Sequence, residues 1–283
     1  MPPAVRVRDL RKRYGALEAL AGVSFDVEQG EVFGLLGPNG AGKTTTVEIL
    51  EGYRARDGGE AEVLGHDPGR AERAFRERIG VVLQHSELWP QLTVREVVRV
   101  FAGYYRHPRG VDETVDLVGL AEKRGARVKT LSGGQKRRLD LAIALAGDPD
   151  VVFLDEPTTG FDPSARRTAW ELIRSLRELG KTILLTTHYL DEAQQLADRV
   201  AVIVGGRIVE LGTPAELIGA SARAEIRYRS NGEQVVVETE RPTAELHRLT
   251  GEALARGEEL DGLEVRRPSL EDVYLELVDE NDA

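Results

Sequence analysis

The segment that most constrains this 283-residue chain is a glycine-rich loop between an apolar run and a helix-like run. The apolar run is Val32–Leu36, and residues 45–50 form a plausible helix after the loop. The loop fits the pattern GxxxxGK[ST], in which glycines let successive backbone N–H groups converge on a phosphate at a helix N-terminus. A glycine-rich turn that matches by accident is the alternative. The residues to which we assign phosphate binding are Gly37, Pro38, Asn39, Gly40, Ala41, Gly42, Lys43, Thr44 and Thr45.

Short β-rich runs alternate with helix-like stretches between Val5 and about Thr213, which predicts an α/β domain with a mainly parallel, buried sheet. An interruption follows the second run: residues 86–130 show apolar residues at helical spacing, and we expect a helical subdomain over about 86–145. The apolar runs expected as strands are 32–36, 79–83, 151–154, 182–186 and 200–204. None of them approaches the roughly 18 to 20 apolar residues that a membrane-spanning helix needs.

Polar side chains stand where three of these runs end. Asp155 and Glu156 follow one buried run, Gln84 follows another, and His188 follows a third. Because buried charges need a partner, we expect Asp155, Thr44 and Gln84 to surround a Mg²⁺ ion, with Glu156 as the base for an attacking water. His188 is placed to donate to a phosphate oxygen. A solvated acidic turn and a structural histidine are the alternatives, and Gln84 carries no signal alone.

The segment Leu131-Ser-Gly-Gly-Gln135 completes a set of motifs in a characteristic order. With GPNGAGKT at 37–44, VVFLDEP at 151–157 and His188, it makes residues 5–213 resemble the ATP-binding cassette family. The resemblance implies a P-loop NTPase fold with a mixed sheet core, ATP and Mg²⁺ as cofactors, and ATP hydrolysis. It also implies two copies that meet head to tail, so that LSGGQ of one covers ATP on the phosphate loop of the other.

The resemblance assigns further residues. Tyr14 matches the aromatic that stacks on adenine, although a half-buried tyrosine at a strand edge is the alternative. Asp162 matches a loop that couples the two nucleotide sites, and Phe161 stands where leucine is commoner. Trp89 lies where the family receives a helix from a membrane-embedded permease, or else it belongs to the local core. The second anion site implied by the motif consists of Ser132, Gly133, Gly134 and Gln135.

The chain changes character after residue 213. Residues 214–283 carry 17 acidic and 8 basic residues, whereas residues 1–213 carry 31 and 30, so the net charge of −10 belongs mostly to the tail. We expect a small α+β appendage with a hairpin at Asn231-Gly232, a helix over 243–256 and a helix N-cap at Ser269. Dimer contact, regulation of hydrolysis and packing on its own cassette remain open as its role.

The C-terminal segment 268–277 resembles the ATPase subunits of drug-resistance and polysaccharide exporters. We therefore expect an exporter ATPase that works as a dimer with a separate permease, in the cytoplasm and peripheral to the inner face of the membrane. A soluble cassette ATPase acting on nucleic acid or ribosomes is the alternative. Against it, an acidic chain binds nucleic acid poorly, and the chain has no cysteine for a zinc module.

Overall fold

A computed structural model describes residues 2–70, 72–82, 88–220, 224–230, 233–266 and 269–282. The chain divides into two compact units, Met1–Leu211 and Gly212–Ala283, which are described separately. Gln84 and the expected hairpin dipeptide Asn231-Gly232 lie outside the described residues.

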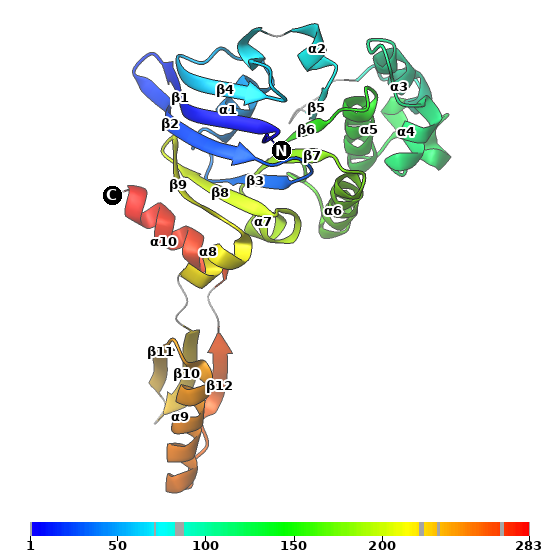
Figure 1. The fold of residues 1–283 in the computed structure, drawn as a ribbon. Coiled ribbons are helices and arrows are strands. Elements are labelled where there is room, and N and C mark those ends of the chain that lie inside the picture. Colours follow the sequence, from blue (N-terminus) through cyan, green and yellow to red (C-terminus); the bar gives the residue numbers. More distant parts are fainter. Residues whose placement is uncertain are drawn as a thin grey trace. The chain divides into compact units, whose positions relative to one another are not determined.

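A six-stranded sheet forms the centre of the first unit, with the strand order β5-β6-β7-β3-β8-β9 (Figure 1). The first five of these strands pair in parallel, as the sequence predicts. Their apolar runs are buried on both faces, as is typical of parallel strands covered by helices. The strands are β5 (Ile79–Val82), β6 (Val151–Asp155), β7 (Thr182–Thr187), β3 (Val32–Leu36), β8 (Arg199–Val204) and β9 (Arg207–Gly212).

A second, three-stranded antiparallel sheet was not predicted. It consists of β1 (Val5–Tyr14), β2 (Leu17–Val27) and β4 (Gly58–Val63) in the order β2-β1-β4. Its strands alternate buried and exposed residues, so they contain no apolar run of the kind that marked the parallel strands. A shared hydrophobic core joins the two sheets, and within it the rings of Phe25 and Phe33 stack with centroids 5.0 Å apart.

Helices occupy the stretch for which the sequence predicted them. Val94, Val97 and Val98 are buried on one face of α3, and Thr93 and Glu96 form a capping box at its start. Further along the sequence, α5 contributes Leu139, Leu141 and Leu145 to the same hydrophobic core. The helices of this unit are α1 (Lys43–Leu50), α2 (Arg73–Arg76), α3 (Val94–Ala102), α4 (Val111–Leu117), α5 (Gly133–Leu145), α6 (Pro163–Glu178) and α7 (Leu190–Leu196), with 3₁₀ turns at 68–70, 121–123 and 128–130.

The second unit is a small α+β body. Its antiparallel sheet has the order β11-β10-β12, and Leu249 and Ala253 are the buried residues of α9. Ser269 and Asp272 cap the last helix reciprocally, because each backbone N–H donates to the other's side chain. The elements are α8 (Pro214–Ala220), β10 (Ala224–Ser230), β11 (Glu233–Thr239), α9 (Pro242–Arg256), β12 (Asp261–Arg266) and α10 (Leu270–Asp282). No helix in the described parts of the chain is both long and apolar enough to cross a bilayer.

Candidate functional site

The glycine-rich loop connects β3 to the N-terminus of α1, the arrangement that the sequence predicts. Gly42 has φ 105°, and a Cβ there would lie 2.7 Å from the Ala19 carbonyl oxygen. At Gly37 a Cβ would lie 2.3 Å from the Ile203 carbonyl oxygen. Only glycine fits both positions, because both contacts are with backbone that cannot move aside. The loop is therefore held in a fixed curve with its amides at the start of a helix.

Lys43 is the first residue of α1 and is 4% exposed. Its ammonium donates to the carbonyl oxygens of Gly37, at 2.8 Å, and Pro38, at 3.1 Å, and lies 3.6 Å from Glu156 Oε1. Burial lowers the pKa of Lys43, while the carboxylates of Glu156 and Asp155 oppose this shift. The loop thus places a cation beside the two acids that follow β6.

Asp155 is the last residue of β6 and is 7% exposed. The hydroxyl of Thr44 donates to its Oδ2 at 3.2 Å, and the hydroxyl of Thr186 donates to its Oδ1 at 2.5 Å. Parallel pairing places Thr186 opposite Asp155 in the neighbouring strand β7. Two oxygen groups on separate elements, Thr44 and Asp155, therefore face each other directly at the carboxyl edge of the sheet.

Glu156 has φ 45°, an unfavourable backbone conformation for a residue other than glycine. Its N–H donates to Thr186 Oγ1 at 2.9 Å, its Oε2 accepts from Thr159 at 3.1 Å, and its Oε1 lies 3.2 Å from Nδ1 of His188. Burial raises the pKa of Glu156, but hydrogen bonding to His188 and the charge of Lys43 outweigh it and lower that pKa overall. The carboxylate is therefore ionised at neutral pH and fixed beside the phosphate loop.

The LSGGQ segment forms the N-terminus of α5. Ser132 Oγ accepts from the Gln135 N–H at 3.3 Å, and Gln135 Oε1 accepts from the Ser132 N–H at 3.0 Å. The motif is thus a capping box, for which the S-x-x-Q pattern of residues 132–135 is the sequence signature. Ser132, Gly133 and Gly134 line a groove with Glu156 and, further along the same loop, Asp162. In the described part of the chain, none of residues 37–44 lines that groove.

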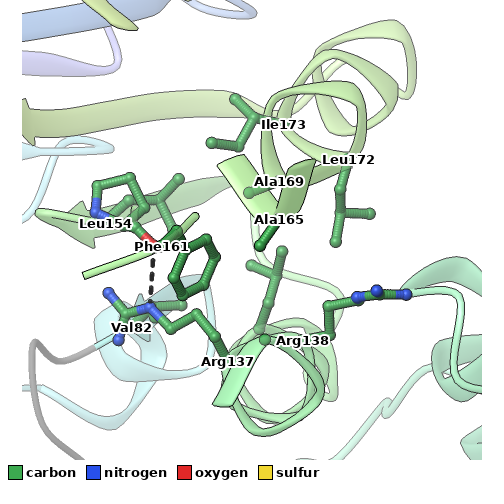
Figure 2. A pocket seen from close by; sticks show the side chains of 12 residues that line it. Val82, Arg137, Arg138, Leu154, Phe161, Ala165, Ala169, Leu172 and Ile173 are labelled. Carbon is green, nitrogen blue, oxygen red and sulfur yellow. Dashed lines mark hydrogen bonds between the residues drawn. The ribbon is translucent and has the colours of Figure 1, made fainter. Parts of the chain in front are cut away.

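Asp162 is the N-cap of α6, and its Oδ1 accepts from the N–H groups of Ser164 and Ala165, both at 2.9 Å. The ring of the preceding Phe161 lies in an apolar pocket between α5 and α6 (Figure 2). Phe161 thus supplies apolar surface at this junction, as leucine would.

Tyr14 is 39% exposed at the end of β1. The Arg54 guanidinium lies 5.2 Å and the Lys12 ammonium 5.6 Å from the centre of its ring. Arg54 donates at 2.5 Å to Glu48 of α1, so this side chain ties the tyrosine to the helix that follows the phosphate loop. Tyr14 is therefore partly exposed, with two cationic side chains close to its ring.

The helical part of the unit carries exposed aromatic side chains. Trp89 is 50% exposed and its ring centroid lies 6.0 Å from that of Phe101, which in turn lies 6.1 Å from that of Tyr104. Tyr104 is 67% exposed. Trp89, Phe101 and Tyr104 are called the aromatic cluster below.

Two carboxyl groups near the site have no sequence signal. Glu192 on α7 is fully buried and accepts from Thr158 at 2.8 Å and from Trp170 Nε1 at 3.2 Å, and burial raises its pKa. Glu51, directly after α1, has its pKa raised to about 8 by burial and by the charges of Asp155 and Glu48. Both raised pKa values arise from the tertiary surroundings of the carboxyl groups, which the neighbouring sequence does not reveal. Among the described residues there is no cluster of three or more histidine, aspartate or glutamate side chains that could hold a metal by itself.

Comparison with known proteins gives consistent results. Residues 20–159 match the sequence profile of a family described as "ABC transporter". The chain is 44% identical to Nod factor export ATP-binding protein I of Paraburkholderia xenovorans (strain LB400), an alignment that covers 89% of this chain and 84% of the relative. It is 40% identical to daunorubicin resistance ATP-binding protein DrrA3 of Streptomyces coeruleorubidus, over 97% of this chain and 95% of the relative.

Solved structures share the fold. One described as the ATP-binding subunit of an ABC transporter aligns with a TM-score of 0.71 at 24% identity, covering 97% of this chain and 99% of that one. Another is described as a dimeric, post-hydrolysis state of the ATP-binding cassette MJ0796 bound to ADP and Pi. It aligns with a TM-score of 0.65 at 25% identity, covering 74% of this chain and 98% of that one.

Proposed function

The chain belongs to the ABC transporter family of ATP-binding proteins, and from this premise we propose that it drives export through a separate membrane permease. It is an ATPase, as members of the family are. The direction of transport is inferred from relatives whose names describe export of Nod factors and resistance to daunorubicin. The exported molecule contacts the permease in this scheme, so we name no substrate.

The observation that supports the proposed mechanism of ATP hydrolysis is the convergence of Lys43, Glu156 and His188. One carboxylate oxygen of Glu156 lies 3.6 Å from the Lys43 ammonium and 3.2 Å from the His188 ring. We propose that the ammonium turns from its loop carbonyls to the outer phosphates of ATP, which leaves Glu156 to accept a proton from the attacking water. We propose that His188, whose Nδ1 lies 3.2 Å from Glu156 Oε1, donates to a γ-phosphate oxygen through a protonated ring nitrogen when ATP is bound.

The residues around Thr44 suit a magnesium ion. Mg²⁺ prefers hard oxygen ligands, keeps several of its waters and takes few protein ligands besides substrate phosphates. Thr44, which is exposed, and Asp155, which is nearly buried, supply two such oxygens, 3.2 Å apart. When bound, Mg²⁺ would neutralise phosphate charge, with Thr44 as the direct ligand and Asp155 acting through water. We also propose Gln84 as a ligand, because it follows the apolar run 79–83 in the sequence.

We propose that a complete site needs a second copy of this chain. Ser132 and the amides of Gly133 and Gly134 begin a helix whose end attracts anions, yet their groove is lined by none of the phosphate loop in the described residues. A phosphate-binding element without its own nucleotide fits a head-to-tail dimer, in which LSGGQ covers ATP on the partner's loop. Phosphate charge then bridges the two copies, and loss of the γ-phosphate releases them.

The proposed permease contact is the aromatic cluster. Exposed tryptophan and tyrosine side chains are enriched at protein interfaces, because they bury a large area and retain a polar end. Trp89 and Tyr104 have this exposure on the helical part of the first unit, where the family receives the permease. Through this contact the chain would work in the cytoplasm, at the inner face of the membrane.

Replacing Glu156 by glutamine tests the proposal, since Gln keeps the shape and removes the base. We expect Glu156→Gln to bind ATP, to hydrolyse it at least about 100-fold more slowly, at the lower end of what a general base contributes, and to elute as a dimer only with ATP. A detergent pull-down with the same variant should recover an integral membrane protein. A variant that remains monomeric at saturating ATP and hydrolyses normally would refute the assignment, and recovery of ribosomes or DNA would refute the transport role.

A further inference from the structure

Arg137 connects the helix that carries LSGGQ to the loop that carries Glu156. It lies in the first turns of α5, two residues after the motif ends at Gln135. Its Nη2 donates to the carbonyl oxygen of Asp155 at 3.1 Å, and its Nε donates to that of Pro157 at 3.2 Å. Figure 2 draws the second of these bonds as a dashed line. The two acceptors are the backbone carbonyls on either side of Glu156.

This link is stiff for physical reasons. A guanidinium is a planar fork with fixed donor directions, so two bonds to one loop define both its distance and its orientation. The aliphatic part of Arg137 lines the pocket of Figure 2 together with Leu141, Leu154 and Phe161. Burial lowers the pKa of Arg137, but an arginine keeps its charge in proteins. The side chain is therefore a partly buried charged link between α5 and the loop that follows β6.

Glu156 depends on such support. Its φ of 45° is a conformation that persists only where the surroundings hold it. On the side of β7, Thr186 holds its backbone N–H. On the side of α5, Arg137 holds the carbonyls before and after it. A small rotation of α5 would therefore shift the carbonyls on both sides of the base.

We propose that Arg137 is a positioning residue that couples the two ATP sites of the dimer: contact of LSGGQ with the partner's nucleotide sets the position of Glu156 in its own copy. The inference rests on the head-to-tail dimer of the proposed function. It assigns the coupling to each single chain, because α5 touches one nucleotide through Ser132 and governs hydrolysis of the other through Arg137.

Mixed dimers distinguish this role from simple contact with ATP. Two full-length copies with different tags are co-expressed, one of them carrying Glu156→Gln, and isolated through both tags. Hydrolysis is then measured while the dimers stay on the second resin, so that only the copy with intact Glu156 turns over. Arg137→Met is placed either in that copy or in its partner. Arg137→Lys is run in parallel, because lysine keeps the charge and loses the fork.

We expect Arg137→Met to lower kcat about tenfold or more when it is in the copy with intact Glu156, since small displacements of catalytic groups have effects of this size. The KM for ATP should stay within about twofold, and Arg137→Lys should restore only part of kcat. In the partner copy, the same substitution should change kcat less than about twofold. A loss confined to the partner copy would mean that Arg137 acts on the nucleotide that its own LSGGQ covers, and would overturn the inference. Equal losses in both placements, or none in either, would overturn it as well.

Arg109 provides the matched control. Its side chain is 14% exposed and donates to Asp148 at 2.6 Å, three residues before β6 begins at Val151. Arg109→Met therefore removes an arginine from the opposite end of the same strand and should lower stability without any difference between the two placements. A failure of the proposed head-to-tail dimer would show at the isolation step, before hydrolysis is measured. Without an ATP-dependent dimer the doubly tagged pair cannot be isolated. In that case the coupling inference is refuted together with the dimer. If the pair can be isolated but Arg137→Met does not change its kcat, only the coupling inference is refuted.

Discussion

Thr186 offers the sharpest quantitative test of how the two acids are held. Its hydroxyl donates to Asp155 Oδ1 at 2.5 Å and accepts from the Glu156 N–H at 2.9 Å, and the residue is fully buried. Thr186→Val keeps the branched shape that suits a strand and removes both bonds. A hydrogen bond to a charged group contributes about 1.5–3 kcal/mol and a neutral one about 1 kcal/mol. We therefore expect the free energy of unfolding to fall by about 2.5–4 kcal/mol.

The same substitution should impair hydrolysis more than binding. Glu156 would lose one support of its unfavourable backbone conformation, so kcat should fall about tenfold or more, by displacement of the base. The Kd for ATP should change little, because the phosphate loop is untouched. Urea unfolding followed by circular dichroism, phosphate release and equilibrium ATP binding measure the three quantities.

Thr182 supplies the control on the same strand. It is 3% exposed and its hydroxyl accepts from the Gly30 N–H at 3.0 Å, four residues and so about 13 Å from Thr186. Thr182→Val should cost about 1 kcal/mol and leave kcat unchanged. If Thr186→Val loses no more stability than Thr182→Val and hydrolyses ATP at the normal rate, the hydroxyl does not hold the two acids.

Three further predictions concern other parts of the first unit. Tyr14→Ala should raise the Kd for ATP about 5- to 150-fold, because stacking on a base contributes about 1–3 kcal/mol, while Tyr14→Phe should change the Kd little. Fluorescence titration of both variants with ATP measures the two Kd values, and an equal loss of affinity in both would indicate a hydroxyl contact instead of stacking. Trp89→Ala should retain the ATPase activity of the isolated subunit and lose recovery of a membrane protein in the pull-down, and full recovery would exclude the aromatic cluster as the contact. Without nucleotide or Mg²⁺, the pKa of about 8 at Glu51 lies above the ordinary 4.5, so the wild type should lose stability as pH rises from about 4.5 through 8. Glu51→Gln should flatten that decline in urea midpoints between pH 5 and 8, and an unchanged slope would show that the pKa of Glu51 is not raised in the folded protein.

The sequence predicted the parallel sheet well because its strands are continuous apolar runs. The β6 and β7 runs both extend one residue beyond the predicted ends, to Asp155 and Thr187, since apolar content alone does not mark where pairing stops. The sheet β2-β1-β4 was not predicted, because the prediction rested on continuous apolar runs, whereas these strands alternate in polarity and contain register shifts. Periodicity located the helical part, where the cap at Thr93 and the buried valines of α3 agree with it.

Residues of the candidate site could be predicted where they belong to a sequence motif. They could not be predicted where strand pairing or helix packing brings them to the site. Lys43, Asp155 and Glu156 stand in motifs, and the fold brings them together. Thr186 acquires its role only through parallel pairing with Asp155, and Arg137 only through the approach of α5 to β6. Such contacts join residues that are distant in the chain, which local patterns do not record.

The absence of cysteine from the chain allows the head-to-tail dimer to be tested directly by cross-linking. Asn39→Cys in one copy and Ser132→Cys in another are combined, both in the Glu156→Gln background, and oxidised with and without Mg-ATP. We expect a disulfide-linked dimer on a non-reducing gel that needs both copies and ATP. If each copy alone gives the same band, if the band is independent of ATP, or if no band forms while both copies bind ATP, two chains do not share the nucleotide and the head-to-tail dimer is refuted.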